Sequence, residues 1–199
     1  MHLATPRIGR SMVATAAGFA AVAAAVIAAA PANADRIHAG TGTQHVLAGE
    51  LSAPQSVALQ AEVDRYVAVT GGTQVGPNRI DLDGRGVILV AIPGERQPRQ
   101  LGQASTVSPA ASACTHSGAA FHHFCAYSGT GFTGSTIDMF SCGRYSIPWV
   151  GNGSWDNNQT TGVRARMYNS AGNLIFTTPP AHSSDRSGDW THVFSVRNC

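Results

Sequence analysis

The chain has 199 residues, of which 43% are hydrophobic and 12% are charged, about half the usual share of charged residues. Its 13 basic residues are all arginine, and the formal net charge is +2. This composition excludes a coiled coil and a highly charged disordered chain. No cluster of arginines along the sequence gives the electrostatic footprint of a nucleic-acid-binding protein, so we expect no nucleic-acid partner.

The first 34 residues have the pattern of a secretory signal peptide. Arg7 and Arg10 form a positive start, Met12 to Ala30 is apolar, and Ala32-Asn33-Ala34 fits a small-residue cleavage site. A single membrane anchor is the alternative, because the apolar stretch is nearly long enough to span a bilayer. The cleavage site favours export. We expect a secreted, extracellular chain, neutral once Arg7 and Arg10 are removed, with no membrane contact.

The next segments are a polar arm and an amphipathic helix. Residues 35–51 are polar and show no period, which predicts a loose N-terminal arm. From Ser52 the apolar residues recur at helical spacing, and Gly71-Gly72 ends the pattern. This predicts one helix of about 15 residues.

Two strands and a linker are expected after the helix. Residues 79–82 alternate between polar and apolar, and residues 87–92 form a continuous β-branched run, with a turn starting at Asp83-Gly84 between them. We therefore predict a helix–hairpin unit over residues 52–93 whose role is open. Residues 94–113, rich in Pro, Gln, Ser and Ala, are predicted to be a linker.

From Cys114 onward, short aromatic and β-branched runs alternate with Gly, Asn, Ser and Pro. This pattern is typical of a compact all-β sandwich or barrel, which we place over residues 114–199. The expected strands are 121–127, 136–140, 163–168, 174–177 and 193–196.

All four cysteines lie in this last segment: Cys114, Cys125, Cys142 and Cys199. An even number in an exported chain predicts two disulfides, for which three connectivities are open. We favour Cys114–Cys125 and Cys142–Cys199, the second tying the last residue back into the domain. In the chain-entropy model these loops contribute about 3 and about 4 kcal/mol.

One stretch carries a family resemblance. In Phe124 to Gly134 an aromatic residue, Tyr127, is followed five positions later by Phe132 and two further on by Gly134. This spacing resembles the Greek-key corner of β/γ-crystallins, in which the second aromatic folds back over the hairpin and the glycine takes a conformation that a Cβ hinders. The Cys-x-Tyr-Ser-Gly-Thr-Gly run also resembles the secreted streptomycete metalloproteinase inhibitors, which are small disulfide-linked proteins of β/γ-crystallin-like fold.

The resemblance is tight over about a dozen residues and implies a mainly β protein. Its C-terminal part would be a β/γ-crystallin-like Greek-key sandwich, preceded by the helix–hairpin unit. A second key would begin at Tyr168, but Asn173 and Ile175 replace its second aromatic and its glycine. The cysteine spacing also departs from that of the inhibitors, so no inhibitory residue carries over and the inhibitory loop is unknown.

A second resemblance concerns calcium. Asp156-Asn157 and Thr160-Thr161 are similar to the calcium motif of β/γ-crystallins, with Thr in place of the final Ser. Hard oxygen ligands suit calcium, and a single carboxylate implies weak binding. The alternative is a polar turn in which these side chains satisfy backbone groups.

The sequence gives little support for a zinc site or for a catalytic site. His116, His122, His123 and Cys125 form a His/Cys cluster, but export favours Cys125 in a disulfide over a zinc site. The sequence has no GxSxG or HExxH motif, and its Ser, His and Asp residues between positions 182 and 192 resemble a polar loop. We therefore expect that the protein is not an enzyme and that it requires no cofactor.

The resemblance and the disulfides together favour a secreted protease inhibitor, directed most of all at metalloproteases. It would be a monomer that binds an extracellular protease by inserting a braced loop into the active-site cleft. Candidate loops are Pro148-Trp149-Val150 and Pro179-Pro180-Ala181. The alternatives are a non-inhibitory calcium-binding or structural module, and a module that binds cell-wall or polysaccharide ligands through exposed aromatics.

Overall fold

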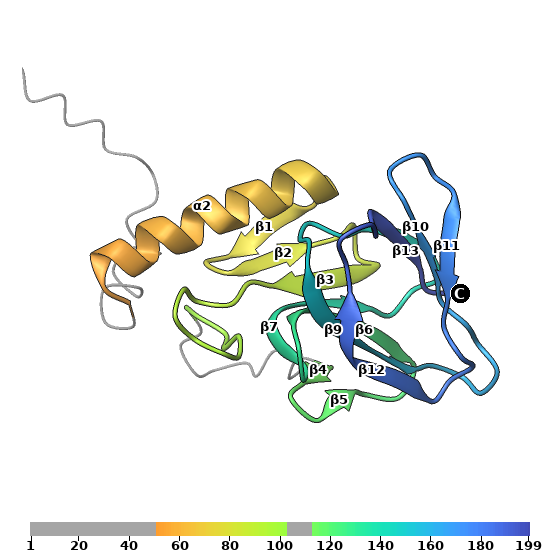
Figure 1. The fold of residues 1–199 in the computed structure, drawn as a ribbon. Coiled ribbons are helices and arrows are strands. Elements are labelled where there is room, and N and C mark those ends of the chain that lie inside the picture. Colours follow the sequence, from red (N-terminus) through yellow and green to blue (C-terminus); the bar gives the residue numbers. More distant parts are fainter. Residues whose placement is uncertain (1–50, 103–112) are drawn as a thin grey trace, which may run out of the picture. The chain divides into compact units, whose positions relative to one another are not determined.

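The computed structural model describes residues 51–102 and 113–199. The predicted signal peptide and nearly all of the N-terminal arm lie outside these residues. The described chain is built from antiparallel sheets and one helix, α2 (Figure 1). The expected mainly β fold class is therefore confirmed. None of the described helices is long and apolar enough to cross a membrane.

Helix α2 spans Ala53–Thr70 and begins and ends as predicted. The Ser52 side chain accepts a hydrogen bond from the Gln55 backbone N–H, and the Gln55 side chain accepts one from the Ser52 backbone, which makes a capping box. Gly71 ends the helix in the left-handed conformation, with φ of 71°. The helix buries three residues on one face: Leu59, Val63 and Tyr66.

The larger sheet has seven antiparallel strands in the order β1-β2-β3-β7-β6-β9-β12. Their bounds in that order are β1 Thr73–Gly76, β2 Arg79–Asp81, β3 Gly86–Leu89, β7 Thr133–Met139, β6 His123–Gly129, β9 Asn152–Asn158 and β12 Ser183–Asp189.

A second sheet has four strands in the order β11-β10-β13-β8. These are β11 Leu174–Thr177, β10 Arg166–Tyr168, β13 Ser195–Arg197 and β8 Arg144–Ser146. A short hairpin joins β4 Cys114–Thr115 to β5 Gly118–Ala119. Side chains from both large sheets and from α2 share one core, so α2 and the four-stranded sheet cover the same face of the seven-stranded sheet.

The helix–hairpin unit is not a separate domain, which corrects the prediction. Strand β3 pairs with β7, so the hairpin extends the sheet of the C-terminal segment. Both belong to one compact unit. A helix and a hairpin cannot bury enough apolar surface alone, whereas the joined sheet gives them a common core.

The described part of the predicted linker is also packed. Leu101 is buried, and its backbone N–H lies 3.4 Å from Asn78 Oδ1. The Gly134 N–H donates to the Arg96 carbonyl oxygen, and the Gln97 side chain donates to that of Phe132. Residues 94–102 therefore lie along the domain as an ordered strap. Leu51, placed in the loose arm by the sequence, is buried as well.

The structure contains strands that the sequence did not reveal, notably β9 and β12. Strand β9 is polar, but its polar groups are satisfied inside the protein: Ser154 Oγ donates to the Gly129 carbonyl and Asn157 Nδ2 to that of Val163. Strand β12 lies at the sheet edge, and Gly188 alone of its seven residues is buried. Neither strand has the apolar alternation on which the prediction rested.

Candidate functional site

Two of the predicted site residues, Cys125 and Asp156, lie together on one face of the seven-stranded sheet. In the register, Asp138 lies opposite Cys125, and Cys125 lies opposite Asp156. Residues directly opposite share a face, and the intervening residues Phe124 and Ile137 point into the core. We call the face that carries Cys125, Asp138 and Asp156 the outer face.

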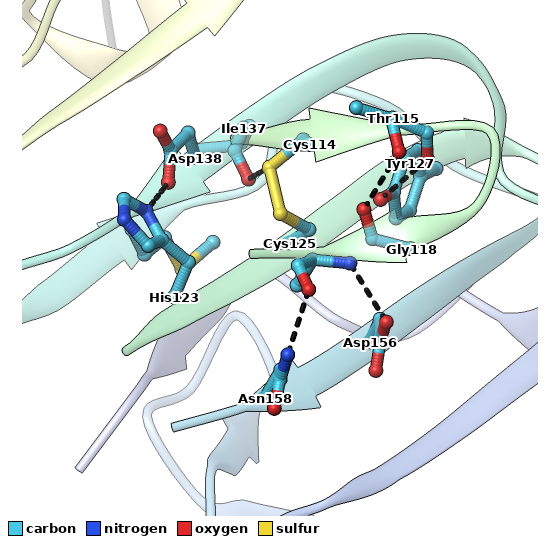
Figure 2. The surroundings of a disulfide bond; sticks show 12 residues. Cys114, Thr115, Gly118, His123, Cys125, Tyr127, Ile137, Asp138, Asp156 and Asn158 are labelled. Carbon is cyan, nitrogen blue, oxygen red and sulfur yellow. Dashed lines mark hydrogen bonds and ion pairs between the residues drawn. A yellow bond between two sulfur atoms is a disulfide. The ribbon is translucent and has the colours of Figure 1, made fainter. Parts of the chain in front are cut away.

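The hairpin β4–β5 lies on the outer face and is joined to it by a disulfide. Cys114 is bonded to Cys125, and the Tyr127 hydroxyl donates to the Thr115 carbonyl oxygen at 3.0 Å (Figure 2). Both cysteines are buried in a small cluster with Tyr127 and Phe132. A hairpin with two residues in each strand is too short to be stable alone, so the disulfide and this cluster hold it.

The predicted corner residues come together. The ring centroids of Tyr127 and Phe132 are 5.0 Å apart, and both rings are buried. Gly134 has φ of 79°, and a Cβ there would lie 2.3 Å from Ser128 Oγ. Ser154 links the two sides of this turn, because its Oγ accepts from the Phe132 N–H and donates to the Gly129 carbonyl.

The predicted second key has no such corner. Tyr168 and Asn173 lie on either side of the β10–β11 turn, where the Asn173 N–H donates to Asn169 Oδ1 at 2.9 Å. Ile175 stands in β11 at a register shift. The ring of Tyr168 is covered instead by the Arg144 guanidinium, 3.8 Å from its centroid.

The structure does not bring the four predicted calcium ligands together. Asp156 and Asn157 are neighbours in β9, so their side chains point to opposite faces of the sheet. Both Asp156 oxygens are engaged: Oδ2 accepts from the Ala119 N–H, and Oδ1 lies 2.9 Å from His182 Nε2. Thr160 and Thr161 are exposed in the loop after β9.

The residues of the predicted His/Cys cluster do not form a metal site either. Cys125 is in the disulfide, and His116 and His122 are exposed. His123 alone of the three has a carboxylate partner among the described residues, with Nδ1 2.5 Å from Asp138 Oδ1 (Figure 2). The Cys114 and Cys125 sulfurs lie near Asp138, but sulfurs bonded to each other cannot act as thiolate ligands.

A cavity of about 670 Å³ opens beside the His123–Asp138 pair. Arg79 and Asp81 bring one charge of each sign to its wall, and Thr136 Oγ1 is a buried wall atom without a hydrogen-bond partner among the described residues. The described wall contains no serine, free thiol or lysine.

Burial dominates the electrostatics of the outer face. It raises the pKa of the Asp138 carboxyl above its ordinary value, and the hydrogen bond from His123 opposes that shift. Burial also raises the pKa of the Tyr127 hydroxyl, with a further rise from the Asp156 and Asp138 carboxylates. Tyr127 therefore stays neutral and serves as a hydrogen-bond donor to the β4–β5 hairpin.

The second disulfide lies away from this face. Cys142, in the loop after β7, is bonded to Cys199. Asn198 supports the junction, since its Nδ2 donates to the Met139 carbonyl and its Oδ1 accepts from the Gly143 N–H. Both disulfides thus have the pairing that the sequence favoured, and the last residue is tied to the loop before β8.

The two loops proposed for inhibition differ in their exposure. Trp149 is buried against Tyr66 and Trp190, with ring centroids 5.8 and 6.4 Å away. Of that loop only Val150 is exposed, so it does not stand clear of the domain as a cleft-filling loop must. In the other loop Pro179 and Pro180 are exposed and only Ala181 is buried.

Strand β11 is the most exposed apolar element of the described chain. Leu174, Ile175 and Phe176 are 53%, 43% and 44% exposed. The strand lies at the end of the four-stranded sheet and pairs only with β10 among the described strands (Figure 1). The sequence predicted a strand at 174–177, but a continuous apolar run does not tell a buried strand from an exposed one.

Comparison with protein-family models, with curated proteins and with solved structures found no match.

Proposed function

We propose that the protein is a secreted inhibitor of extracellular proteases, directed at metalloproteases, and that β11 is the segment that enters the active-site cleft. The observation that carries the proposal is the exposed apolar edge strand. Extended peptides add to an exposed sheet edge through main-chain hydrogen bonds, with pockets that take alternate side chains. Strand β11 offers both the extended backbone and the apolar side chains.

The strand is also held in place, which an inhibitor requires. It pairs with β10, and the Phe176 ring packs against Trp155 with centroids 6.2 Å apart. A segment that is ordered before binding loses less conformational entropy in the complex, and so binds more tightly and leaves more slowly.

The finer fold assignment belongs to the same proposal. The Tyr127, Phe132 and Gly134 corner supports a β/γ-crystallin-like key, and the two disulfides support an oxidising, extracellular compartment. The calcium-binding alternative gains no support from the geometry, because its four oxygen donors do not converge.

The test is a titration of the oxidised mature chain against a thermolysin-type metalloprotease, with subtilisin-type and trypsin-type proteases alongside. The proposal predicts stoichiometric inhibition of the metalloprotease. Failure of folded, uncleaved protein to inhibit any of the three contradicts it.

Two variants then locate the contact. Leu174→Glu with Ile175→Glu places charge on β11 and should weaken inhibition by at least about tenfold. Val57→Glu is the matched control, because Val57 lies on α2 and is 72% exposed. If the β11 variant inhibits as well as the control, β11 is not the inhibitory segment.

A further inference from the structure

The solvent-facing side of the four-stranded sheet carries three arginines in a row. In the register, Arg166 of β10 lies opposite Arg197 of β13, and Arg197 lies opposite Arg144 of β8. Residues directly opposite on antiparallel strands share a face, with Cβ atoms about 5 Å apart. The neighbours of these arginines, Met167 and Val196 among them, are buried, so all three guanidinium groups lie on the exposed face. We call Arg144, Arg166 and Arg197 the arginine row.

No aspartate or glutamate side chain among the described residues pairs with the row. Arg144 lies over the Tyr168 ring with its Nη1 3.5 Å from Ser195 Oγ, and Arg166 donates at 3.1 Å to an oxygen of the carboxyl group of Cys199, the last residue. Three other exposed arginines of the described chain pair with acidic side chains: Arg65 with Glu62, Arg85 with Asp83 and Arg99 with Glu95.

Such a row is costly for folding alone. Like charges directly opposite each other on neighbouring strands destabilise a sheet, and Arg197 faces an arginine on each side, with only Arg166 partly compensated by the Cys199 carboxyl group. Local arrangements that oppose stability are expected mostly at functional sites. An anionic ligand along the row would remove the repulsion.

A second row of side chains, next to the arginine row on the same face, indicates which kind of anion would bind. This second row consists of Ser146, Ser195 and Tyr168 on the same three strands, followed by Leu174 on β11. Serine hydroxyls beside the guanidinium groups can bond to sugar hydroxyls, and a guanidinium binds a carboxylate through two parallel hydrogen bonds. Tyr168 is already covered by Arg144, so it offers no free ring for stacking a nucleic-acid base.

We infer that the exposed face of the four-stranded sheet binds an acidic polysaccharide, with the carboxylates of the sugar chain lying along Arg144, Arg197 and Arg166. Successive strands place the backbones of the three arginines in a line about 5 Å apart, so the row extends across three strands as a linear polymer does. This inference does not rest on the proposed protease inhibition.

The test uses the oxidised mature chain and polygalacturonate as the probe, with calorimetry at low and at physiological salt. Binding should weaken as salt rises, since exposed charges are screened. Neutral dextran is the polymer control and should not bind. No binding of polygalacturonate at low salt overturns the inference, and so does tighter binding of duplex DNA, which would assign the row to nucleic acid.

Variants connect the binding to the row. Arg197→Gln removes the central charge and should weaken binding by about tenfold. Arg96→Gln is the matched control, an exposed arginine outside the sheet, and should change binding by less than about twofold. The melting temperature of Arg197→Gln should equal or exceed that of the wild type, because a repulsion is lost. Equal loss of binding in both variants contradicts the assignment.

Discussion

Gly134 is a residue at which backbone conformation and packing both exclude a side chain. Its φ of 79° is nearly that of Gly172, at 80°, but a Cβ at Gly172 meets no atom within 4 Å. Gly134→Ala and Gly172→Ala should both lose about 1–2 kcal/mol for the left-handed backbone. Gly134→Ala should lose about 1–3 kcal/mol more, because the methyl group meets Ser128 Oγ. Urea unfolding measures the difference, and equal losses contradict this account of the corner.

Asp138 gives a pH prediction. Its pKa is raised in the folded state by burial, with His123 and Arg79 as the opposing charges and Asp81 on the same cavity wall. The unfolded state therefore loses its proton first as pH rises, so this group contributes most stability at acid pH and loses it up to the folded-state pKa. Asp138→Asn cannot ionise.

The stability gain of the Asp138→Asn variant over the wild type should accordingly grow from about pH 4 until the wild-type carboxyl is ionised. Urea midpoints measured at several pH values check this. A gain that shrinks with rising pH would mean that the ion pair with His123 outweighs the burial of the charge.

At the scale of elements, the two disulfides do different work. Cys114–Cys125 closes a separation of 11 residues and clamps the β4–β5 hairpin, whereas Cys142–Cys199 closes 57. Replacing both cysteines of a pair by serine should cost about 3 kcal/mol for the first and about 4 kcal/mol for the second. Amide exchange should become fast in β4–β5 only when the first pair is removed. Fast exchange there in the second variant instead would contradict this division.

Elements with a strong local signal could be predicted, and those defined by tertiary contacts could not. Helix α2 has a cap at each end and apolar residues one turn apart, so its bounds follow from the sequence. Strand β9 reads as a polar turn, because the partners that satisfy Ser154 and Asn157 come from distant segments. The prediction of a separate helix–hairpin unit was wrong for the same reason, because no local pattern in the sequence reveals that β3 pairs with β7.

The candidate sites, like the elements, could be predicted where the signal is local and could not where it depends on tertiary contacts. The Tyr127, Phe132 and Gly134 corner was visible as a spacing within one hairpin. The calcium ligands were chosen by spacing too, but a strand turns adjacent side chains to opposite faces. The arginine row was invisible, because its members lie far apart in the sequence and only the sheet register aligns them.

For the whole molecule, the shared sheet predicts that the C-terminal segment does not fold alone. Without residues 51–102, strand β7 loses its β3 partner, and the core loses Ile80, Ile88 and the buried face of α2. A chain of residues 113–199 should show no cooperative thermal unfolding, whereas residues 51–199 should unfold cooperatively. Calorimetry of both chains measures whether each unfolds cooperatively. Equal melting temperatures of the two chains would support the two-domain interpretation instead.

If β11 occupies a protease cleft, amide hydrogen exchange of the mature chain should change when a thermolysin-type metalloprotease is added. Exchange should slow at residues 174–177, where main-chain hydrogen bonds to the protease would form. No slowed exchange anywhere, or slowing confined to residues 148–151 or 179–182, would contradict it.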